Sequence, residues 1–539
     1  MPPQLSKPIQ TIRSVQIPGK PSTWDVTIGY PPDAQRGIIT SITPHNRKDA
    51  TTDTTTFATN TVDGNNNSPL LLPSLTHPHI HLDKAFIHNS PIYTHLYPRS
   101  GSFAEALSNT AQAKSTFHLN RSDLLRRGEW LLSESLAAGV TSIRAFVEVD
   151  ETVGTTCLEV GLDLKRRWAG VCQIQIVCFA QDPVFSFSSS GTSSDSSSSS
   201  PHHRVHNNNG GNANMDVIER ALSTRSLVEG IDVLGTTPYV EDCYENARRN
   251  VEWAFNTAME KGLHLDFHLD YNLDPNKGAM VWDIVSALSK TGWTRAMPAG
   301  THGNDIETER VQTVSGTTQK KVMLGHCTRL TIFSAEEWKK LASIIHHTNL
   351  PLSFVGLPTS DLYMASPPRD NNMQNSQPGL KQRGTLNVPD MIISHGLDAV
   401  IGVNNVGNAF TPWGKPDPLC LACLGVGLYQ LGTQEGAELL YQCISTRARA
   451  AIGIDNSLST GVYSSSPILK EGDPADFLLL YNLDETGLGM SRGRSSVAEV
   501  VWDPPSTPTR DVITAGRLVV KPMAAERAQS SPETCFVHI

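Results

Sequence analysis

The chain has 539 residues, with 44 Lys and Arg against 53 Asp and Glu, so its formal net charge is −9. Hydrophobic residues make up 39% of the chain and charged residues 18%, a balance that permits a large core and excludes global disorder. A mildly acidic chain argues against a general partner such as nucleic acid or an anionic membrane surface.

Membrane insertion and secretion are not expected either. The longest apolar runs fall far short of the about 20 residues that a bilayer crossing needs. The first ten residues contain three prolines and no hydrophobic segment, so we expect no secretory signal. The nine cysteines then predict reduced thiols in a cytoplasmic protein. Cys420 and Cys423 form a CxxC motif within an apolar run, where we expect core packing.

Four polar stretches interrupt the apolar pattern and are interpreted as surface insertions. Ser, His, Asn and Gly dominate the second of them, which cannot bury enough apolar surface to order itself. We therefore expect a disordered insertion there. The four stretches are Asn46–Ser68, Ser186–Asn214, Pro298–Gln319 and Ser366–Gln382.

Short apolar, β-branched runs recur between the insertions, and helical patterns separate most of them. In Asp123–Ala138 leucines repeat at helical spacing and Gly139 follows as a stop, while Ser334 and Glu337 form a capping box. Eight strands alternating with helices predict an α/β fold, a parallel (β/α)8 barrel of the TIM type over residues 69–454. The alternative, a doubly wound sheet, lacks a GxGxxG motif after its first strand. The eight runs are Leu70–Leu75, Thr141–Val149, Ile174–Ala180, Ile231–Gly235, Leu263–Leu269, Val322–Gly325, Pro351–Leu357 and Ala399–Val403.

The two chain ends have a different pattern, with strand-like runs and turns in place of helices. We expect residues 1–67 and 455–539 to build one small β-sandwich domain that brackets the barrel. Its expected strands are Trp24–Ile28, Gly37–Ile42, Asp476–Leu480 and Val512–Val520.

Histidines follow three of the predicted barrel strands. His79 and His81 are two residues apart at the end of the first strand, so they share a face at the C-terminal end of the barrel, where barrel active sites lie. Two imidazoles side by side are typical of a metal site. His268 and His326 end the fifth and sixth strands. His264 lies deeper in its strand and is interpreted as a core residue.

This arrangement resembles the amidohydrolase superfamily, and specifically its cytosine deaminase-like branch. The resemblance rests on His79–Asp83, His268 and His326, and it extends to Phe179–Gln181 and Gly402–Gly414. It implies a metal-dependent hydrolase of non-peptide C–N bonds, a deaminase or an amide hydrolase, that acts on a small substrate such as a heterocycle.

The same resemblance implies roles for individual residues. His79, His81 and His268 would bind one divalent metal, zinc as the first expectation and iron as the second. His326 would contact the metal-bound water or the reacting group, and Gln181 would line the substrate pocket.

Two positions depart from the family pattern. Asn404 stands where the family places a metal-binding Asp, and Tyr271 stands where its deaminases place a Glu. An Asn carries no charge and cannot accept a proton as a base, and a phenol with a pKa near about 10 is a poor base. Either protons take another route, through Asp270, Asp361 or His326, or the chain binds metal or ligand without turnover.

Two further residues follow predicted strands and are candidates for substrate contacts. Asp361 lies after the seventh strand, and Trp413 lies in the loop after the eighth. Either could line the pocket, although a loop cap and a packing residue are the structural alternatives.

Overall fold

The computed structural model describes residues 2–32, 36–46, 68–185, 213–290, 293, 320–365, 384–454, 469–486, 488–519 and 536–538. The insertion expected at 186–214 lies outside this part of the chain, except for its last two residues, which open helix α4 (Ala213–Ser223). The other three polar stretches also lie mainly outside it.

Eight parallel strands form the central sheet, and their order in space is their order in the sequence. Ile80 forms a parallel bridge with Asn404, which brings the first strand beside the segment after the last one and nearly closes the sheet. The predicted (β/α)8 barrel is thereby confirmed. The strands are β5 (Leu75–His81), β6 (Val140–Glu148), β7 (Gln173–Ala180), β8 (Val233–Thr236), β9 (His264–Leu269), β10 (Val322–His326), β11 (Leu352–Gly356) and β12 (Ala399–Ile401).

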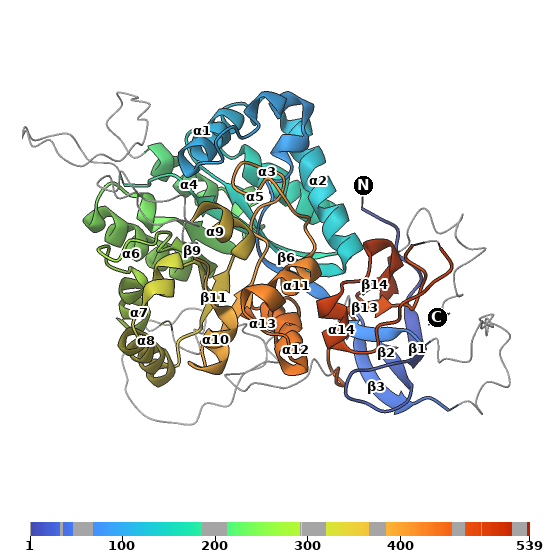
Figure 1. The fold of residues 1–539 in the computed structure, drawn as a ribbon. Coiled ribbons are helices and arrows are strands. Elements are labelled where there is room, and N and C mark those ends of the chain that lie inside the picture. The colour runs from blue at the N-terminus through green and yellow to red at the C-terminus, as the bar shows by residue number, and fades with distance from the viewer. Residues whose placement is uncertain are drawn as a thin grey trace, which may run out of the picture.

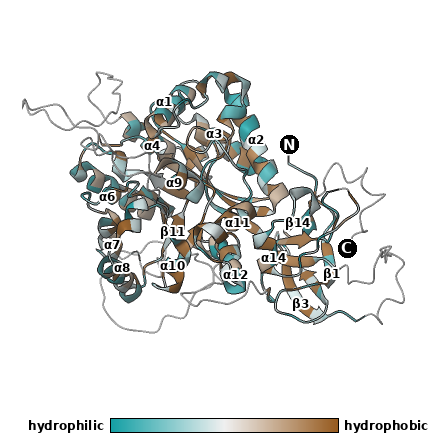
Figure 2. Ribbon diagram, in the orientation of Figure 1, coloured by the Kyte–Doolittle hydropathy of each residue, from teal (hydrophilic) through white to brown (hydrophobic). Residues whose placement is uncertain are grey.

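Helices surround the barrel, and their hydrophilic residues lie mainly on the outer side (Figures 1 and 2). Helix α2 ends where the sequence predicts, because Gly139 takes a positive φ of 109° that favours glycine. The capping box of Ser334 and Glu337 is also present. The helices besides α4 are α1 (Phe103–Lys114), α2 (Arg121–Ala138), α3 (Thr156–Arg167), α5 (Arg225–Val228), α6 (Tyr244–Lys261), α7 (Val281–Lys290), α8 (Ala335–Thr348), α9 (Pro358–Met364), α10 (Val388–Ile393), α11 (Pro418–Leu428), α12 (Gln434–Cys443), α13 (Thr446–Ala451) and α14 (Val497–Trp502).

Short 3-10 segments connect several of these elements. They are η2 (Ile87–Asn89), η3 (Pro91–Leu96), η4 (Pro238–Val240), η5 (Thr328–Ile332) and η6 (Thr507–Thr509).

Strands from both chain ends form two four-stranded sheets beside the barrel (Figure 1). The predicted run Leu70–Leu75 divides between two sheets, since Leu70–Pro73 pairs antiparallel with Phe477–Leu480 and only Leu75 belongs to the barrel. The sheet orders are β16-β1-β2-β3 and β15-β14-β13-β4, with β1 (Ile9–Val15), β2 (Trp24–Gly29), β3 (Ile38–Pro44), β4 (Leu70–Pro73), β13 (Phe477–Leu480), β14 (Arg510–Thr514), β15 (Arg517–Leu518) and β16 (Phe536–His538).

A buried ion pair fastens these end sheets to the barrel. The Arg510 guanidinium donates to both carboxylate oxygens of Asp417, at 3.0 and 2.8 Å, and to the carbonyl oxygen of Ala138. Tyr441 adds a hydrogen bond from its hydroxyl to the carbonyl of Pro73. Because a buried charge is costly unless it is paired, these contacts hold the two parts in one arrangement.

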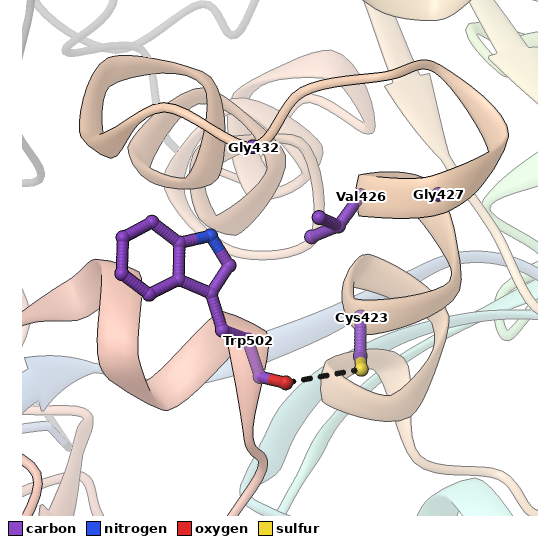
Figure 3. A pocket seen from close by; sticks show the side chains of 5 residues that line it. All are labelled: Cys423, Val426, Gly427, Gly432 and Trp502. Atoms are coloured by element: carbon purple, nitrogen blue, oxygen red, sulfur yellow. Dashed lines mark hydrogen bonds between the residues drawn. The ribbon is translucent and has the colours of Figure 1, made fainter.

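The expectation of core packing for the CxxC motif is wrong for Cys420, which is exposed on α11. Cys423 is half-buried and lines an apolar hollow of about 430 Å3 between α11 and α14, beside Trp502 (Figure 3). Its Sγ lies 3.6 Å from the carbonyl oxygen of Trp502. In the described part of the chain, no helix has both the length and the apolar character needed to cross a bilayer.

Candidate active site and metal centre

Three imidazoles converge at the C-terminal end of the barrel strands. His79 and His81 come from the end of β5 and His268 from the end of β9. The Nε2 atom of His268 lies 3.2 Å from the Nε2 atoms of both His79 and His81. All three side chains are at most 2% exposed. The period-two argument for the HxH pair thus places two donors on one face, and the sheet brings the third to meet them.

The donor set fits a divalent cation such as zinc. Ligands held about 2.0–2.1 Å from one zinc ion at tetrahedral angles lie about 3.3 Å apart, which is close to the observed separations. Burial lowers the pKa of all three histidines well below its ordinary value, so the rings are neutral and have lone pairs to offer. Hydrogen bonds among three neutral rings cannot satisfy all three converging Nε2 atoms, because one shared proton is not enough for three lone pairs. A cation bound by all three nitrogens would satisfy them.

Neighbouring side chains fix the orientation of these rings. The ring of His79 lies 4.0 Å from that of Phe146, and the ring of His268 lies 4.4 Å from that of Phe179, between centroids. The Nδ1 atom of His79 is 3.8 Å from Asp266, whose other oxygen pairs with Arg144 at 3.3 Å. With Nε2 turned to the centre, the Nδ1 side of His79 faces a carboxylate, as is usual for metal-binding histidines.

His326 lies next to this group at the end of β10. Its ring centroid is 5.1 Å from that of His268 and 6.2 Å from that of His79. Its Nδ1 atom is 2.7 Å from Oδ1 of Asp361. For Asp361 the sequence leaves a substrate contact, a proton-carrying role and a loop cap open; its side chain is fully buried and bonded to His326.

Asn404 follows β12 and is held against the HxH strand through the backbone. Its N–H donates to the carbonyl of His79 at 3.1 Å, and its carbonyl accepts from the N–H of His81 at 2.8 Å. The side-chain oxygen is buried and has no hydrogen-bond partner. A buried carbonyl without a donor is costly, and a cation is one group that would satisfy it.

The other candidates differ in their relation to the centre. Tyr271 packs on His326 with 4.3 Å between ring centroids. Asp270 instead accepts hydrogen bonds from the backbone N–H groups of Met280 and Val281, at the start of α7. Burial raises the pKa of Asp270 to about 6. Trp413 is 46% exposed, and no contact found among the described residues joins it to the histidines.

A buried charge network adjoins the site and reaches Gln181. The ammonium of Lys84 pairs with Glu148 and also donates to Oε1 of Gln181 at 3.3 Å. Lys114, the last residue of α1, pairs with Glu148 as well and with Asp150 at 2.8 Å. The network therefore ties α1 and the end of β6 to the side chain that the resemblance places in the substrate pocket.

Opposite charges decide the protonation of this network. Burial alone would raise the pKa of Glu148, but Lys114 and Lys84 together lower it to about 2. Burial raises the pKa of neighbouring Asp83 to about 6, and the charge of Glu148 adds to that rise. Glu148 is thus the carboxylate that stays ionised between two lysines.

Sequence reasoning gave no role to several of these residues. Glu148 and Lys114 are 34 residues apart, and only folding brings them together. Asp266 was the exception that a signal could have found, because it shares a strand face with His264 and His268. His264 itself is buried, and its Nδ1 accepts from the N–H of Lys321, in agreement with a core role.

Comparison with known proteins places the fold. No family model matches the sequence, and no curated protein matches it. Solved structures do. The 5-methylcytosine deaminase from Klebsiella pneumoniae is 18% identical, with a TM-score of 0.64 over 95% of this chain and 97% of that one.

Two further structures are similar. For N-isopropylammelide isopropylaminohydrolase from Burkholderia multivorans, the identity is 20% and the TM-score 0.60, over 94% of this chain and 97% of the other. For the zinc complex of the atrazine chlorohydrolase TrzN from Arthrobacter aurescens, the values are 14% and 0.56, over 95% of each chain. The chain thus shares the fold of these hydrolases. The amidohydrolase resemblance found in the sequence is confirmed at the level of the fold.

The convergence of three histidines predicts zinc binding. Full-length protein incubated with Zn2+ and dialysed should retain one equivalent, and His268→Ala should lose it because two imidazoles remain of three. The matched control is His118→Ala, since His118 is an exposed histidine. Metal content by mass spectrometry measures both. Retention of zinc by the His268 variant, or none in the wild type, would contradict the assignment.

The Glu148 network predicts a pH-dependent contribution to stability. Because its pKa falls from 4.5 to about 2 on folding, Glu148 stabilises the protein above its ordinary pKa and loses this effect as the pH falls toward 2. Glu148→Gln should lower the free energy of unfolding by about 3 kcal/mol at pH 7, and by progressively less from pH 5 to pH 3.

Urea denaturation at each pH measures this difference in stability. The control is Glu159→Gln. Glu159 pairs with Arg121 and its side chain is 41% exposed, so its loss should change the free energy of unfolding by about 0.5 kcal/mol or less. A Glu148 effect that is constant with pH would contradict the ionised pairing.

Proposed function

We propose that the chain is a metal-dependent hydrolase that cleaves a non-peptide C–N bond in a small, planar nitrogen heterocycle. The observation that carries the proposal is the set of three neutral, buried Nε2 atoms of His79, His81 and His268, which converge as ligands beside His326. A divalent cation held by these three imidazoles would supply Lewis-acid chemistry, namely a water of lowered pKa as nucleophile for the carbon of the C–N bond.

An aromatic wall near the histidines supports a planar substrate. Ring contacts run from His326 to Tyr271 at 4.3 Å, on to Phe103 at 5.8 Å, and from Phe103 to Phe410 at 6.0 Å, between centroids. The Lys84 ammonium lies 5.9 Å from the centre of the Phe410 ring. Aromatic faces and edges bind flat heterocycles well.

Polar groups at the same place would orient such a substrate. Gln181 offers both donors and an acceptor on one amide, which is the pattern that recognises a ring carrying C=O and N–H groups. Lys84 bonds to the Gln181 oxygen, so it fixes that amide with its NH2 group free to turn toward a substrate carbonyl. His326 would move a proton at Nε2 as the C–N bond breaks and the amine leaves.

The similar structures support the substrate class. Their names describe enzymes that act on 5-methylcytosine, an alkylated ammelide and atrazine, and a further similar structure is a guanine deaminase with guanine bound, at a TM-score of 0.53. All of these are flat nitrogen heterocycles. The resemblance and the aromatic wall therefore point to the same kind of molecule.

The proposal predicts amine release from such heterocycles. Zinc-loaded protein should release ammonia or an alkylamine from at least one of cytosine, 5-methylcytosine, guanine or an N-alkylammelide. His268→Ala should abolish the activity, whereas His118→Ala should keep it. Coupled ammonia assays and product chromatography measure the rate. A silent zinc-loaded protein across the panel would count against the proposal.

The departures at Asn404 and Tyr271 allow a test between a working enzyme and an impaired homologue. The double change Asn404→Asp and Tyr271→Glu supplies a charged ligand and a proton shuttle. An impaired homologue should gain about 10²–10⁴-fold in rate, the usual worth of general acid–base catalysis. A working enzyme should lose activity on its own substrate, because its site is built around neutral groups. Steady-state rates of the two proteins on the same panel decide.

A further inference from the structure

Asp361 has no oxygen to spare as an acceptor for a substrate, because both of its oxygens are engaged and the residue is 0% exposed. Oδ1 lies 2.7 Å from Nδ1 of His326. Oδ2 accepts from the hydroxyl of Thr385 at 2.8 Å and from the backbone N–H of Leu357 at 3.2 Å. An ionised carboxylate only accepts hydrogen bonds, so the group that faces Oδ1 must be a donor.

This requirement fixes the tautomer of His326. Whenever the ring is neutral, its single proton must lie on Nδ1, and Nε2 then carries a lone pair. Nε2 makes no hydrogen bond to any residue that the structure describes. The ring is 4.3 Å from Tyr271 and 5.1 Å from His268 between centroids, so the side of the ring away from Asp361 belongs to the candidate active site.

We propose that Asp361 is a positioning residue that holds His326 in the Nδ1–H tautomer and so presents the Nε2 lone pair to the pocket as an acceptor. The catalytic consequence rests on the proposed function, whereas the tautomer does not. The site has no carboxylate at position 404 or 271. The Asp361–His326 pair gives it an oriented proton acceptor, the Nε2 atom of His326, from the end of β10.

One substitution inverts the tautomer without changing the shape of the side chain. In Asp361→Asn, the donors Thr385 and Leu357 keep the amide oxygen at the Oδ2 position. The amide NH2 group then faces Nδ1 of His326 and donates to it. His326 must respond with its own proton on Nε2, and the lone pair is lost from the pocket. In serine proteases, the same Asp-to-Asn change behind the catalytic histidine lowers kcat about 10⁴-fold through the wrong tautomer.

The test is NMR of the full chain labelled with 15N-histidine, in zinc-loaded and metal-free forms. The signals of His326 are assigned by their loss in His326→Gln. The wild type should show a protonated Nδ1, and Asp361→Asn a protonated Nε2. The matched control is Asp25→Asn, because Asp25 makes the same Oδ1 to Nδ1 contact with His45, at 2.8 Å, in the end sheets. That variant should leave the His326 signals unchanged.

Kinetics and metal content complete the test. On a substrate that the wild type turns over, Asp361→Asn should lower kcat about 10²–10⁴-fold and change KM by less than about threefold, with zinc content unchanged. A protonated Nε2 in the wild type, an unaltered tautomer in the variant, or an unchanged kcat with an inverted tautomer would each overturn the inference. A protein that is silent on every substrate overturns the proposed function, and the NMR spectra still decide the role of Asp361.

Discussion

Three neutral imidazoles face one another inside the barrel without enough protons to satisfy them. Burial makes each ring neutral. The Nε2 atom of His268 lies 3.2 Å from the Nε2 atoms of both His79 and His81, so two neighbours compete for it. Hydrogen bonding alone is a poor solution for three such nitrogens, and a cation is a good one. The closed sheet supports this arrangement, because β5 and β9 carry the rings on rigid strands and Phe146 and Phe179 hold their orientation.

Apart from Asp266, which faces only the Nδ1 side of His79, the buried acids near the three imidazoles are engaged in other contacts, and this sets the charge of the centre. Asp361 bonds to His326, Asp270 to the backbone at the start of α7, and Glu148 to two lysines. With Asn404 in place of a carboxylate, a cation at the three imidazoles would keep its full charge. A more electron-poor cation lowers the pKa of its water further, as at neutral three-histidine zinc sites. The missing carboxylates are thus compatible with chemistry at neutral pH.

Periodicity in the sequence was enough for the barrel, since most strands of the sheet are short runs rich in apolar residues that alternate with helical patterns. It also placed His79 and His81 on one face, because alternation along a strand is a local property. An apolar run does not reveal which sheet it joins. For this reason the pattern predicted Leu70–Pro73 as part of the first barrel strand, whereas these residues pair with β13 in an end sheet. The partners of Asp361 and Glu148 could not be predicted either, because Leu357, Thr385, Lys84 and Lys114 reach them only through the fold.

Backbone conformation adds an argument about whether this site still works. Asp270 directly follows β9, His326 is the last residue of β10, and Asn404 follows β12. All three have a positive φ, of 50°, 66° and 66° respectively. Left-handed backbone is uncommon outside glycine, although Asp, Asn and His adopt it more readily than other residues do, and it persists where surrounding contacts impose it. Two of these residues stand beside the three imidazoles, since the ring of His326 is 5.1 Å from that of His268 and Asn404 bonds through its backbone to His79 and His81. A vestigial site could relax such strain by substitution to glycine at His326 and Asn404, whereas at Asp270 the hydrogen bonds to the start of α7 would be lost. Two strained ends kept beside one set of metal donors are therefore easier to explain if the geometry is in use.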